Sequence, residues 1–420
     1  MSRVIVIGAG LAGLVAANRL ADAGANVTML TKGLGGLQLG QGTIDVLGYR
    51  PQRVTNPLLE LSEAFPEAGE GDRVHPYSVI GAKAVHESLA YLLTIVPDLL
   101  VGDAEANYQL PTAVGAIRPT CLAQPSMLAG NVAAGKKFAI VGLRQLKDFQ
   151  PKLIAQNLAR TDLPEGGRVT ARDLMLDFAA REPEIDSFGL TYARAFDDPD
   201  YRARFAAALK PLLAEGEIVG LPAVIGIKDA NAWRDLAERL DHPVFEIPLP
   251  PPSVPGMRLN EALTARAKAK GVRWVPGVRT IAYHALDGRV TAVSTATVPA
   301  PKEYKADAFV LATGGFESGS LTLDSYGNVT ETLFGLPLAG TDRPLVHGDY
   351  WGAEQPLFEV GVMVDAQMRP RAAAGVPVYS NLYAAGGIIG GTSRWRELSG
   401  DGIALASALK AADAILEELA

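Results

Sequence analysis

The sequence predicts an α/β protein with a Rossmann-like nucleotide-binding domain to which both ends of the chain contribute. Three observations indicate this fold. The apolar run at 4–7 is typical of a buried strand and leads directly into the glycine loop at 8–13. A helical pattern and a second apolar run at 27–30 complete a strand–loop–helix–strand unit. Helix and strand patterns alternate again between residues 260 and 315, so the α/β organisation returns late in the chain.

The glycine loop has the spacing that a cofactor phosphate requires. Gly8 allows a tight turn off the strand, Gly10 lets the backbone approach a phosphate, and Gly13 lets the helix pack close to the sheet. Backbone N–H groups and the positive end of the helix dipole then meet the anion. We therefore expect the following residues to bind a cofactor: Gly8, Ala9, Gly10, Leu11, Ala12 and Gly13.

Two further glycine segments lie near the other end of the chain. The strand pattern at 308–311 runs into a glycine turn, and another strand pattern ends in glycines at 386–387. A closing helix begins near Gly402, and its N-terminus offers further backbone N–H groups. These segments are expected to contact the same cofactor through Thr313, Gly314, Gly386, Gly387, Gly402 and Ile403.

Composition excludes several classes of function. A net charge of −7 without any Lys/Arg-rich block argues against nucleic acid as a partner and favours a small-molecule substrate. The single cysteine, Cys121, allows no internal disulfide and no thiolate-bound iron–sulfur cluster within this chain. No metal-ligand cluster or Ser/His/Asp order stands out, so we expect no metal site. Without an apolar run of membrane-spanning length, the chain is expected to be cytoplasmic, with only indirect membrane contact.

The middle of the chain is expected to form a separate, inserted domain. Helical patterns occur there at 79–95, 148–160, 201–213 and 229–240, and strand patterns at 138–142, 168–170 and 217–219. A proline-rich segment at 248–255 is expected to be an extended connector. The resulting boundaries are 1–74 and 247–420 for the two parts of the nucleotide-binding domain, and 75–246 for the insertion.

The chain resembles a known flavoprotein superfamily in three segments. They are the loop at 8–13, the Ala312-Thr313-Gly314-Gly315 strand end and the Ala385-Gly386-Gly387 segment, and they resemble those of fumarate reductase flavoproteins and aspartate oxidases. The segments at 30–33, 41–47 and 250–259, with the overall length, look like the B-subunit family of anaerobic glycerol-3-phosphate dehydrogenase, a family of flavoproteins. This resemblance implies a FAD/NAD(P)-binding domain with an inserted α+β cap domain, and it adds Gly42 to the expected cofactor residues.

One departure from the superfamily concerns the cofactor. Its members usually place an acidic residue at the end of the second strand, where it holds the adenosine ribose hydroxyls. Thr31, Lys32 and Gly33 occupy that place here, so the carboxylate is missing and a cation suits a phosphate better. The resemblance to the B-subunit family implies FMN, which this loop favours, and FAD held by Thr31 is the alternative. All three residues are expected to contact the cofactor.

The resemblance also implies an activity. It is the quinone-linked oxidation of sn-glycerol 3-phosphate to dihydroxyacetone phosphate, within a complex that includes a catalytic flavoprotein subunit and an iron–sulfur membrane-anchor subunit. Electrons would pass to a membrane quinone through these partners, from a chain that is peripheral to the inner face of the cell membrane. The alternatives are a stand-alone flavin dehydrogenase or reductase of the same superfamily, and a non-catalytic scaffold that keeps the flavin fold.

No residue is assigned as the catalytic base. His75 and His347 lie in loops near the expected domain junctions and are the best candidates, whereas His86 and His242 are expected to be structural. Four arginines in glycine- or proline-rich segments could face the flavin, a carboxylate or a phosphate group: Arg118, Arg258, Arg371 and Arg394.

Overall fold

The chain divides into two compact units. The computed structural model describes residues 2–66, 74–164, 166–298, 300–349, 351–372 and 375–420. Unit 1 comprises Met1–Gly36, Asp45–Ile95 and Ala262–Ala420, and unit 2 comprises Leu37–Ile44 and Val96–Glu261. Unit 1 therefore draws on three separated stretches of the chain.

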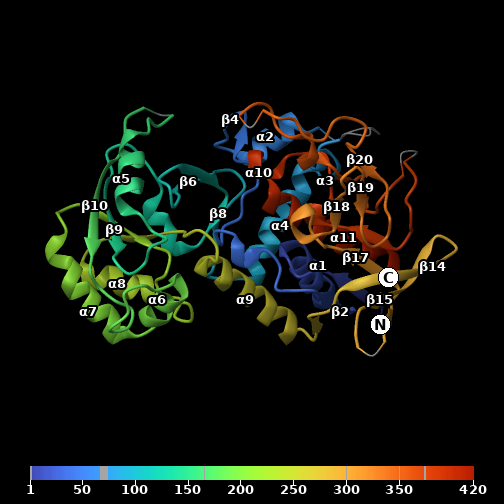
Figure 1. The fold of residues 1–420 in the computed structure, drawn as a ribbon, viewed down its shortest axis with the longest axis horizontal. Helices are drawn as coiled ribbons and strands as arrows, with labels where there is room; N and C mark the ends of the chain where they lie inside the picture. The colour runs from blue at the N-terminus through green and yellow to red at the C-terminus, as the bar shows by residue number, and fades with distance from the viewer. Residues whose placement is uncertain (1, 67–73, 165, 299, 350, 373–374) are drawn as a thin grey trace. The chain divides into compact units, whose positions relative to one another are not determined.

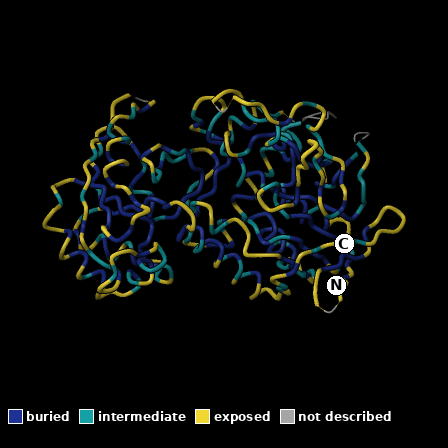
Figure 2. The backbone as a smooth tube through the Cα atoms, in the orientation of Figure 1, coloured by how far each residue is buried: buried dark blue, intermediate teal, exposed yellow. Residues whose placement is uncertain are grey.

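A five-stranded parallel sheet forms the centre of unit 1, in the order β13-β2-β1-β17-β22, of which β2 and β17 are labelled in Figure 1. Its strands are β1 (Arg3–Ile7), β2 (Asn26–Thr31), β13 (Arg273–Pro276), β17 (Ala308–Leu311) and β22 (Leu382–Ala384). The N-terminal β1 pairs directly with β17, with Val6 opposite Val310. Both central strands are almost wholly buried, which is typical of parallel sheets and explains their continuous apolar runs (Figure 2).

The helices of unit 1 also join the two ends of the chain. They are α1 (Leu11–Asp22), α2 (Pro57–Ala64), α3 (Pro76–Ile80), α4 (Ala82–Ile95), α10 (Arg394–Glu397) and α11 (Gly400–Leu419). The blue α1 and the red α11 pack side by side, with Arg19 Nε 2.6 Å from Asp413 Oδ1 (Figure 1). Lys410 Nζ of α11 donates to the carbonyl oxygen of Val79 at 2.7 Å. Through these contacts residues 75–95 cluster with unit 1, although the sequence placed them in the insertion.

Antiparallel strands complete unit 1. The longest form the sheet β14-β15-β16, in which the hairpin turn predicted at 287–290 joins β14 to β15. The strands are β14 (Thr280–Leu286), β15 (Arg289–Thr295), β16 (Lys302–Lys305), and the short pairs β3 (Tyr49–Arg50) with β4 (Gln52–Arg53), β18 (Leu321–Leu323) with β19 (Val329–Glu331), and β20 (Leu338–Ala339) with β21 (Gly361–Val362).

Unit 2 has a parallel sheet of its own, in the order β10-β9-β11-β12. Its strands are β9 (Lys137–Leu143), β10 (Thr170–Leu176), β11 (Ile218–Pro222) and β12 (Val244–Ile247), and its helices are α5 (Pro151–Arg160), α6 (Gly189–Phe196), α7 (Pro199–Leu209) and α8 (Ala232–Leu240). Two short antiparallel pairs accompany them: β5 (Val101–Gly102) with β8 (Leu122–Ala123), and β6 (Tyr108–Pro111) with β7 (Ile117–Thr120).

Local backbone chemistry explains where the elements differ from the predicted ones. The helix predicted at 79–95 is divided at Gly81, whose φ of +84° ends α3 before α4 begins. Helix α9 (Val254–Ala269) begins inside the segment expected to be an extended connector, because a proline at 255 is compatible with a first helical turn. The boundary between the two units falls within this helix.

Candidate functional site

The candidate site of unit 1 lies at the carboxyl ends of its parallel strands. The strand order corresponds to 3-2-1-4-5 along the chain, so the connections change direction between β1 and β17. Ligands of open α/β sheets bind beside such a switch point, outside the carboxyl ends of the strands. The glycine segments predicted from the sequence follow β1, β2, β17 and β22, which are neighbours in this sheet. The fold therefore brings these segments to one edge.

Gly8 and Gly13 make the close approaches expected of them. Gly8 has a φ of +114°, and a Cβ atom at this position would lie 2.1 Å from the carbonyl oxygen of Ala312, at the end of β17. A Cβ atom on Gly13 would lie 2.0 Å from the carbonyl oxygen of Gly8. Any side chain at either position would collide with backbone. The two glycines therefore hold the start of α1 against the ends of both switch-point strands.

Gly10 differs from these two glycines because space is open beside it. A Cβ atom here would have no neighbour within 4 Å, and the backbone has an ordinary extended conformation with φ −75° and ψ −175°. Gly10 is the N-cap of α1, where no side chain accepts a hydrogen bond. The first helical hydrogen bond runs from Leu14 N to Gly10 O, so the amides of residues 11–13 have no acceptor within the helix. These amides can hold an anion.

The loop after β2 folds over the first glycine loop. Gly35 has a φ of +77°, and a Cβ atom there would lie 2.2 Å from the carbonyl oxygen of Ala9. Buried Thr31 directs its hydroxyl to its own turn, where it hydrogen-bonds to the carbonyl oxygen of Gly33 and accepts from its amide. Lys32 is exposed. The hydroxyl of Thr31 is thus engaged locally in this structure.

The segments after β17 and β22 meet each other and α1. The hydroxyl of Thr313 is buried and has no hydrogen-bond partner among the described residues. A Cβ atom on Gly387 would lie 3.4 Å from the Cα atom of Gly314, and one on Gly386 would lie 2.9 Å from the Cβ atom of Ala12. A buried hydroxyl without a partner is costly unless a ligand satisfies it. Thr313 is therefore suited to hydrogen-bond a bound cofactor.

Two segments predicted to bind the cofactor have other partners. The amide of Gly402 donates to the carbonyl oxygen of Asp45 at 2.9 Å, and Ile403 is wholly buried in the core. Gly42 belongs to unit 2, where its carbonyl oxygen accepts from Gln124 Nε2 at 3.2 Å. The structure thus brings the segments at 8–13, 31–33, 313–314 and 386–387 to one sheet edge, and gives residues 402 and 42 structural contacts.

The candidate base His75 uses both of its ring nitrogens in structural contacts. Its Nδ1 accepts from the amide of Tyr77 at 3.1 Å, so Nε2 donates to Glu397 Oε2 at 3.0 Å. Phe65 stacks on the ring at a centroid distance of 3.9 Å. Burial raises the pKa of Glu397, but hydrogen bonds, chiefly from His75, outweigh it and leave this pKa below its ordinary value.

The other histidines are peripheral. His347 is exposed and hydrogen-bonds to Gln355, and His86 and His284 are also exposed. His242 Nδ1 lies 3.0 Å from the carbonyl oxygen of Glu217, in agreement with a structural role. Among the described residues, no hydrogen bond or ion pair connects these histidines to the segments that follow β1 and β17.

The candidate Arg258 is half-buried in a polar network of unit 2. It forms an ion pair with the buried Glu246 at 2.7 Å and donates to the carbonyl oxygens of Ile225 and Gly226. Glu246 also accepts from Ser126 Oγ at 2.6 Å. Arg258 is therefore a structural residue of unit 2.

Two other candidate arginines also lie within secondary structure or the core. Arg118 belongs to β7 of unit 2, where it lies opposite Leu110 of β6 in an antiparallel pair. Arg371 of unit 1 is 9% exposed, and its amide donates to the carbonyl oxygen of Met363. Neither residue lies in the segments that follow β1, β2, β17 or β22.

Arg394 is the arginine that reaches the candidate site. Its Nη1 donates to the carbonyl oxygen of Ile389 at 2.8 Å, and its Nη2 lies 3.5 Å from the position of a Cβ atom on Gly315. Burial lowers the pKa of its guanidinium, and the charge of Glu317 opposes this shift. Glu317 accepts from the amide of Gly315 at 2.9 Å. Glu317 was not among the predicted site residues, although an acid two residues after a strand-end glycine pair was a usable signal.

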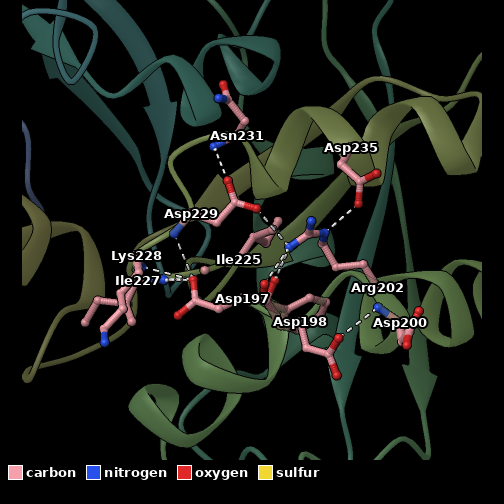
Figure 3. A network of polar contacts seen from close by, with 12 residues as sticks. Asp197, Asp198, Asp200, Arg202, Ile225, Ile227, Lys228, Asp229, Asn231 and Asp235 are labelled. Carbon is pink, nitrogen blue, oxygen red and sulfur yellow. Dashed lines mark hydrogen bonds and ion pairs between the residues drawn. The ribbon is translucent and has the colours of Figure 1, made fainter.

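The loop after β11 of unit 2 contains a cluster of backbone amides comparable to that at the start of α1. These amides already donate to a side chain of the protein (Figure 3). Oδ1 of Asp197 accepts from three successive amides, those of Ile227, Lys228 and Asp229, at 2.9 to 3.0 Å. The buried Arg202 pairs with Asp229 and Asp235 beside it. A side chain of the protein thus takes the place that an anionic ligand could occupy, whereas the amides after Gly10 have no such partner among the described residues.

Similarity to known proteins first defines the class of protein to which this chain belongs. Residues 3–403 match the model of the FAD-binding domain family, and the sheet order and glycine loop described above are those of such a domain. The match supports a flavin of the FAD type and gives no support to FMN, which the loop after the second strand favoured. The FMN interpretation rested on the resemblance to the B-subunit family and on Thr31 and Lys32, but the absence of an acid after β2 does not by itself exclude an adenosine half.

Relatives that match the chain over its full length place it in a particular family within this class. The probable anaerobic glycerol-3-phosphate dehydrogenase B-subunit of Halobacterium salinarum is 31% identical over 100% of this chain and 98% of its own length. The anaerobic glycerol-3-phosphate dehydrogenase B-subunit of Pectobacterium carotovorum is 30% identical over 99% of this chain and 98% of its own length. The chain belongs to the B-subunit family of anaerobic glycerol-3-phosphate dehydrogenase, as its resemblance implied.

A solved structure of 3-ketosteroid Δ1-dehydrogenase from Sterolibacterium denitrificans is 11% identical, covers 100% of both chains and has a TM-score of 0.49. In the described part of the chain, no helix is long and apolar enough to cross a membrane. The same residues contain no group of three or more potential metal ligands.

The residues at the sheet edge fit a flavin nucleotide. The open space at Gly10 and the amides that follow suit a phosphate, and the unpartnered hydroxyl of Thr313 suits a polar group of the cofactor. Among the described residues nothing comparable to a ribose-binding carboxylate follows β2, where Thr31 is engaged in its own turn.

Proposed function

We propose that this chain is the FAD-carrying B-subunit of a quinone-linked glycerol-3-phosphate dehydrogenase. It binds FAD at the edge formed by residues 8–13, 31–33, 313–314 and 386–387, and it takes part in the oxidation of sn-glycerol 3-phosphate to dihydroxyacetone phosphate. The names of its full-length relatives support the activity. The observation that carries the assignment of the site is the set of amides after Gly10 without a helical acceptor, at the switch point between β1 and β17.

In this proposal the residues of the chain bind and orient the cofactor. The amides of residues 11–13 hold its diphosphate, and Gly10 lets that group approach the backbone. The hydroxyl of Thr313 donates a hydrogen bond to the flavin portion, because the segments after β17 and β22 adjoin the glycine loop. When bound, the flavin supplies an acceptor for two electrons and a donor that passes them on.

Partner subunits complete the electron path in this proposal. Both relatives are named as the B-subunit of an enzyme, which supports a complex of several subunits. Cys121 is buried and is the only cysteine, so an iron–sulfur cluster would have to reside on a different chain. We therefore propose a catalytic flavoprotein subunit and an iron–sulfur membrane-anchor subunit as partners, with a membrane quinone as the final acceptor and this chain peripheral to the membrane.

The experiment is an anaerobic reduction of purified protein. The chain is purified alone and with co-expressed partner subunits, and its acid-released cofactor is identified by mass spectrometry. We expect FAD in the isolated chain, and bleaching of the flavin absorbance by sn-glycerol 3-phosphate only when the partners are present. Bleaching in the isolated chain would favour a stand-alone dehydrogenase. Absence of flavin from both preparations would overturn the proposal and favour a scaffold.

A further inference from the structure

The carboxyl edge of the unit 1 sheet carries two charged side chains on the side opposite β2. Both converge on Gly315, which follows β17. A Cβ atom on this residue would lie 3.0 Å from Glu317 Oε2 and 3.5 Å from Arg394 Nη2. The same edge is formed by Gly387 after β22, whose carbonyl oxygen lies 3.1 Å from that position. A cation and an anion thus meet the backbone where two of the predicted cofactor segments join.

The sheet order indicates which half of the cofactor reaches these charges. In this class of fold the adenosine ribose lies beside the end of the second strand, and the diphosphate lies at the N-terminus of the first helix. β2 and β17 lie on opposite sides of β1. A dinucleotide whose diphosphate is at Gly10 and whose adenosine is over β2 must extend its other half, the flavin, over β17 and β22. Arg394 and Glu317 lie on that side.

Arg394 has few partners in the protein. Its Nη1 donates to the carbonyl oxygen of Ile389, and among the described residues it forms no ion pair. Arg394 is half-buried, so water solvates its charge only in part, and this burial lowers the pKa of its guanidinium. A partly solvated cation with spare donors gains from any negative charge that develops beside it. By contrast Glu317 is exposed, and its carboxylate accepts from the amide of Gly315.

We propose, on the basis of the function proposed above, that Arg394 and Glu317 set the reduction potential of the bound flavin. Reduction of the flavin by two electrons and one proton adds a negative charge to it. Arg394 stabilises this charge and raises the potential, and Glu317 opposes it and lowers the potential. Because Glu317 is exposed and solvent screens its charge, its effect is the smaller of the two.

The test is a spectroelectrochemical titration of the flavin in the purified, FAD-loaded protein. For Arg394→Gln we expect the preference for reduced over oxidised flavin to fall about tenfold, which lowers the midpoint potential of a two-electron couple by about 30 mV. Arg394→Lys keeps the charge and should retain most of the potential. Glu317→Gln should raise it by a smaller amount.

Arg396 provides the matched control, because it lies two residues away on the same short helix. Its side chain is 59% exposed, and it pairs with Glu354 at 3.5 Å. Arg396→Gln should leave the midpoint potential unchanged, and an equal shift in both arginine variants would overturn the proposal. So would an unchanged potential in Arg394→Gln.

Two further outcomes are decisive. If Arg394→Gln does not retain FAD, the midpoint potential of Glu317→Gln becomes the test. An unchanged potential in that variant refutes the proposal. If the wild-type protein contains no flavin, the proposed function fails, and the role of Arg394 fails with it. A flavin-loaded wild type with insensitive variants leaves the proposed function standing and removes only this inference.

Discussion

Replacing Gly10 by valine should separate cofactor binding from folding. A Cβ atom at this position meets nothing within 4 Å, and the φ of −75° with ψ of −175° is an extended conformation that valine adopts readily. The helix loses only the advantage of glycine over a β-branched N-cap, about 1 kcal/mol. The folded protein therefore accommodates the side chain.

The same side chain would occupy the space in front of the α1 amides. Each charge-assisted hydrogen bond from an amide to a phosphate oxygen contributes about 1.5–3 kcal/mol. Loss of two of them weakens binding by at least about 3 kcal/mol, which is more than a hundredfold in Kd. Flavin content of the purified Gly10→Val protein should fall to less than about a tenth of the wild-type value.

The assay combines flavin absorbance per polypeptide with thermal unfolding of the cofactor-free proteins. Gly348→Val is the matched control, since a Cβ atom there also has no neighbour within 4 Å and the residue is exposed. It should keep its flavin. Gly13→Val, whose Cβ atom would lie 2.0 Å from a backbone oxygen, should lose both flavin and stability. Stoichiometric flavin in Gly10→Val would refute the placement of the phosphate.

The remaining predictions concern stability. Arg258→Ala leaves buried Glu246 unpaired and should destabilise unit 2 by about 3–5 kcal/mol, whereas the double variant Arg258→Met/Glu246→Leu should be much less affected; equal urea midpoints for the two would contradict this. The pKa of Glu397 lies below its ordinary value, so its ionisation stabilises the protein above about pH 4.3, and this stabilisation is lost as the pH falls through the lowered pKa; Glu397→Gln should show a flatter acid limb in thermal melts. Asp197→Ala leaves three amides without their acceptor and should increase hydrogen exchange at residues 227–229, while exchange like the wild type would refute the contact.

That these candidate cofactor segments meet at one sheet edge could be predicted, because the signals of each segment are local. A buried strand followed by glycines defines each of the segments at 8–13, 313–314 and 386–387, and the parallel sheet then places their ends together. The open position of Gly10 follows from the loop spacing alone. Such patterns involve residues that are only a few positions apart, so they can be recognised in the sequence itself.

Contacts between distant residues could not be predicted in the same way. The amide of Gly402 was expected to face a cofactor, yet it donates to Asp45, hundreds of positions earlier in the chain. Arg258 was likewise a candidate for anion binding until the structure paired it with buried Glu246. Helix amides and guanidinium groups accept many partners, and only the three-dimensional arrangement decides among them.

The order of strands in unit 1 has a consequence for biosynthesis. β17 and β22 complete one side of the sheet from the switch point, yet the ribosome translates them only after the whole of unit 2, and α11 follows β22. During synthesis, the apolar strand β1 therefore lacks its neighbour β17 on one side. Unit 2 can meanwhile fold around its own sheet. The edge proposed to bind FAD is therefore complete only after β22 has been synthesised.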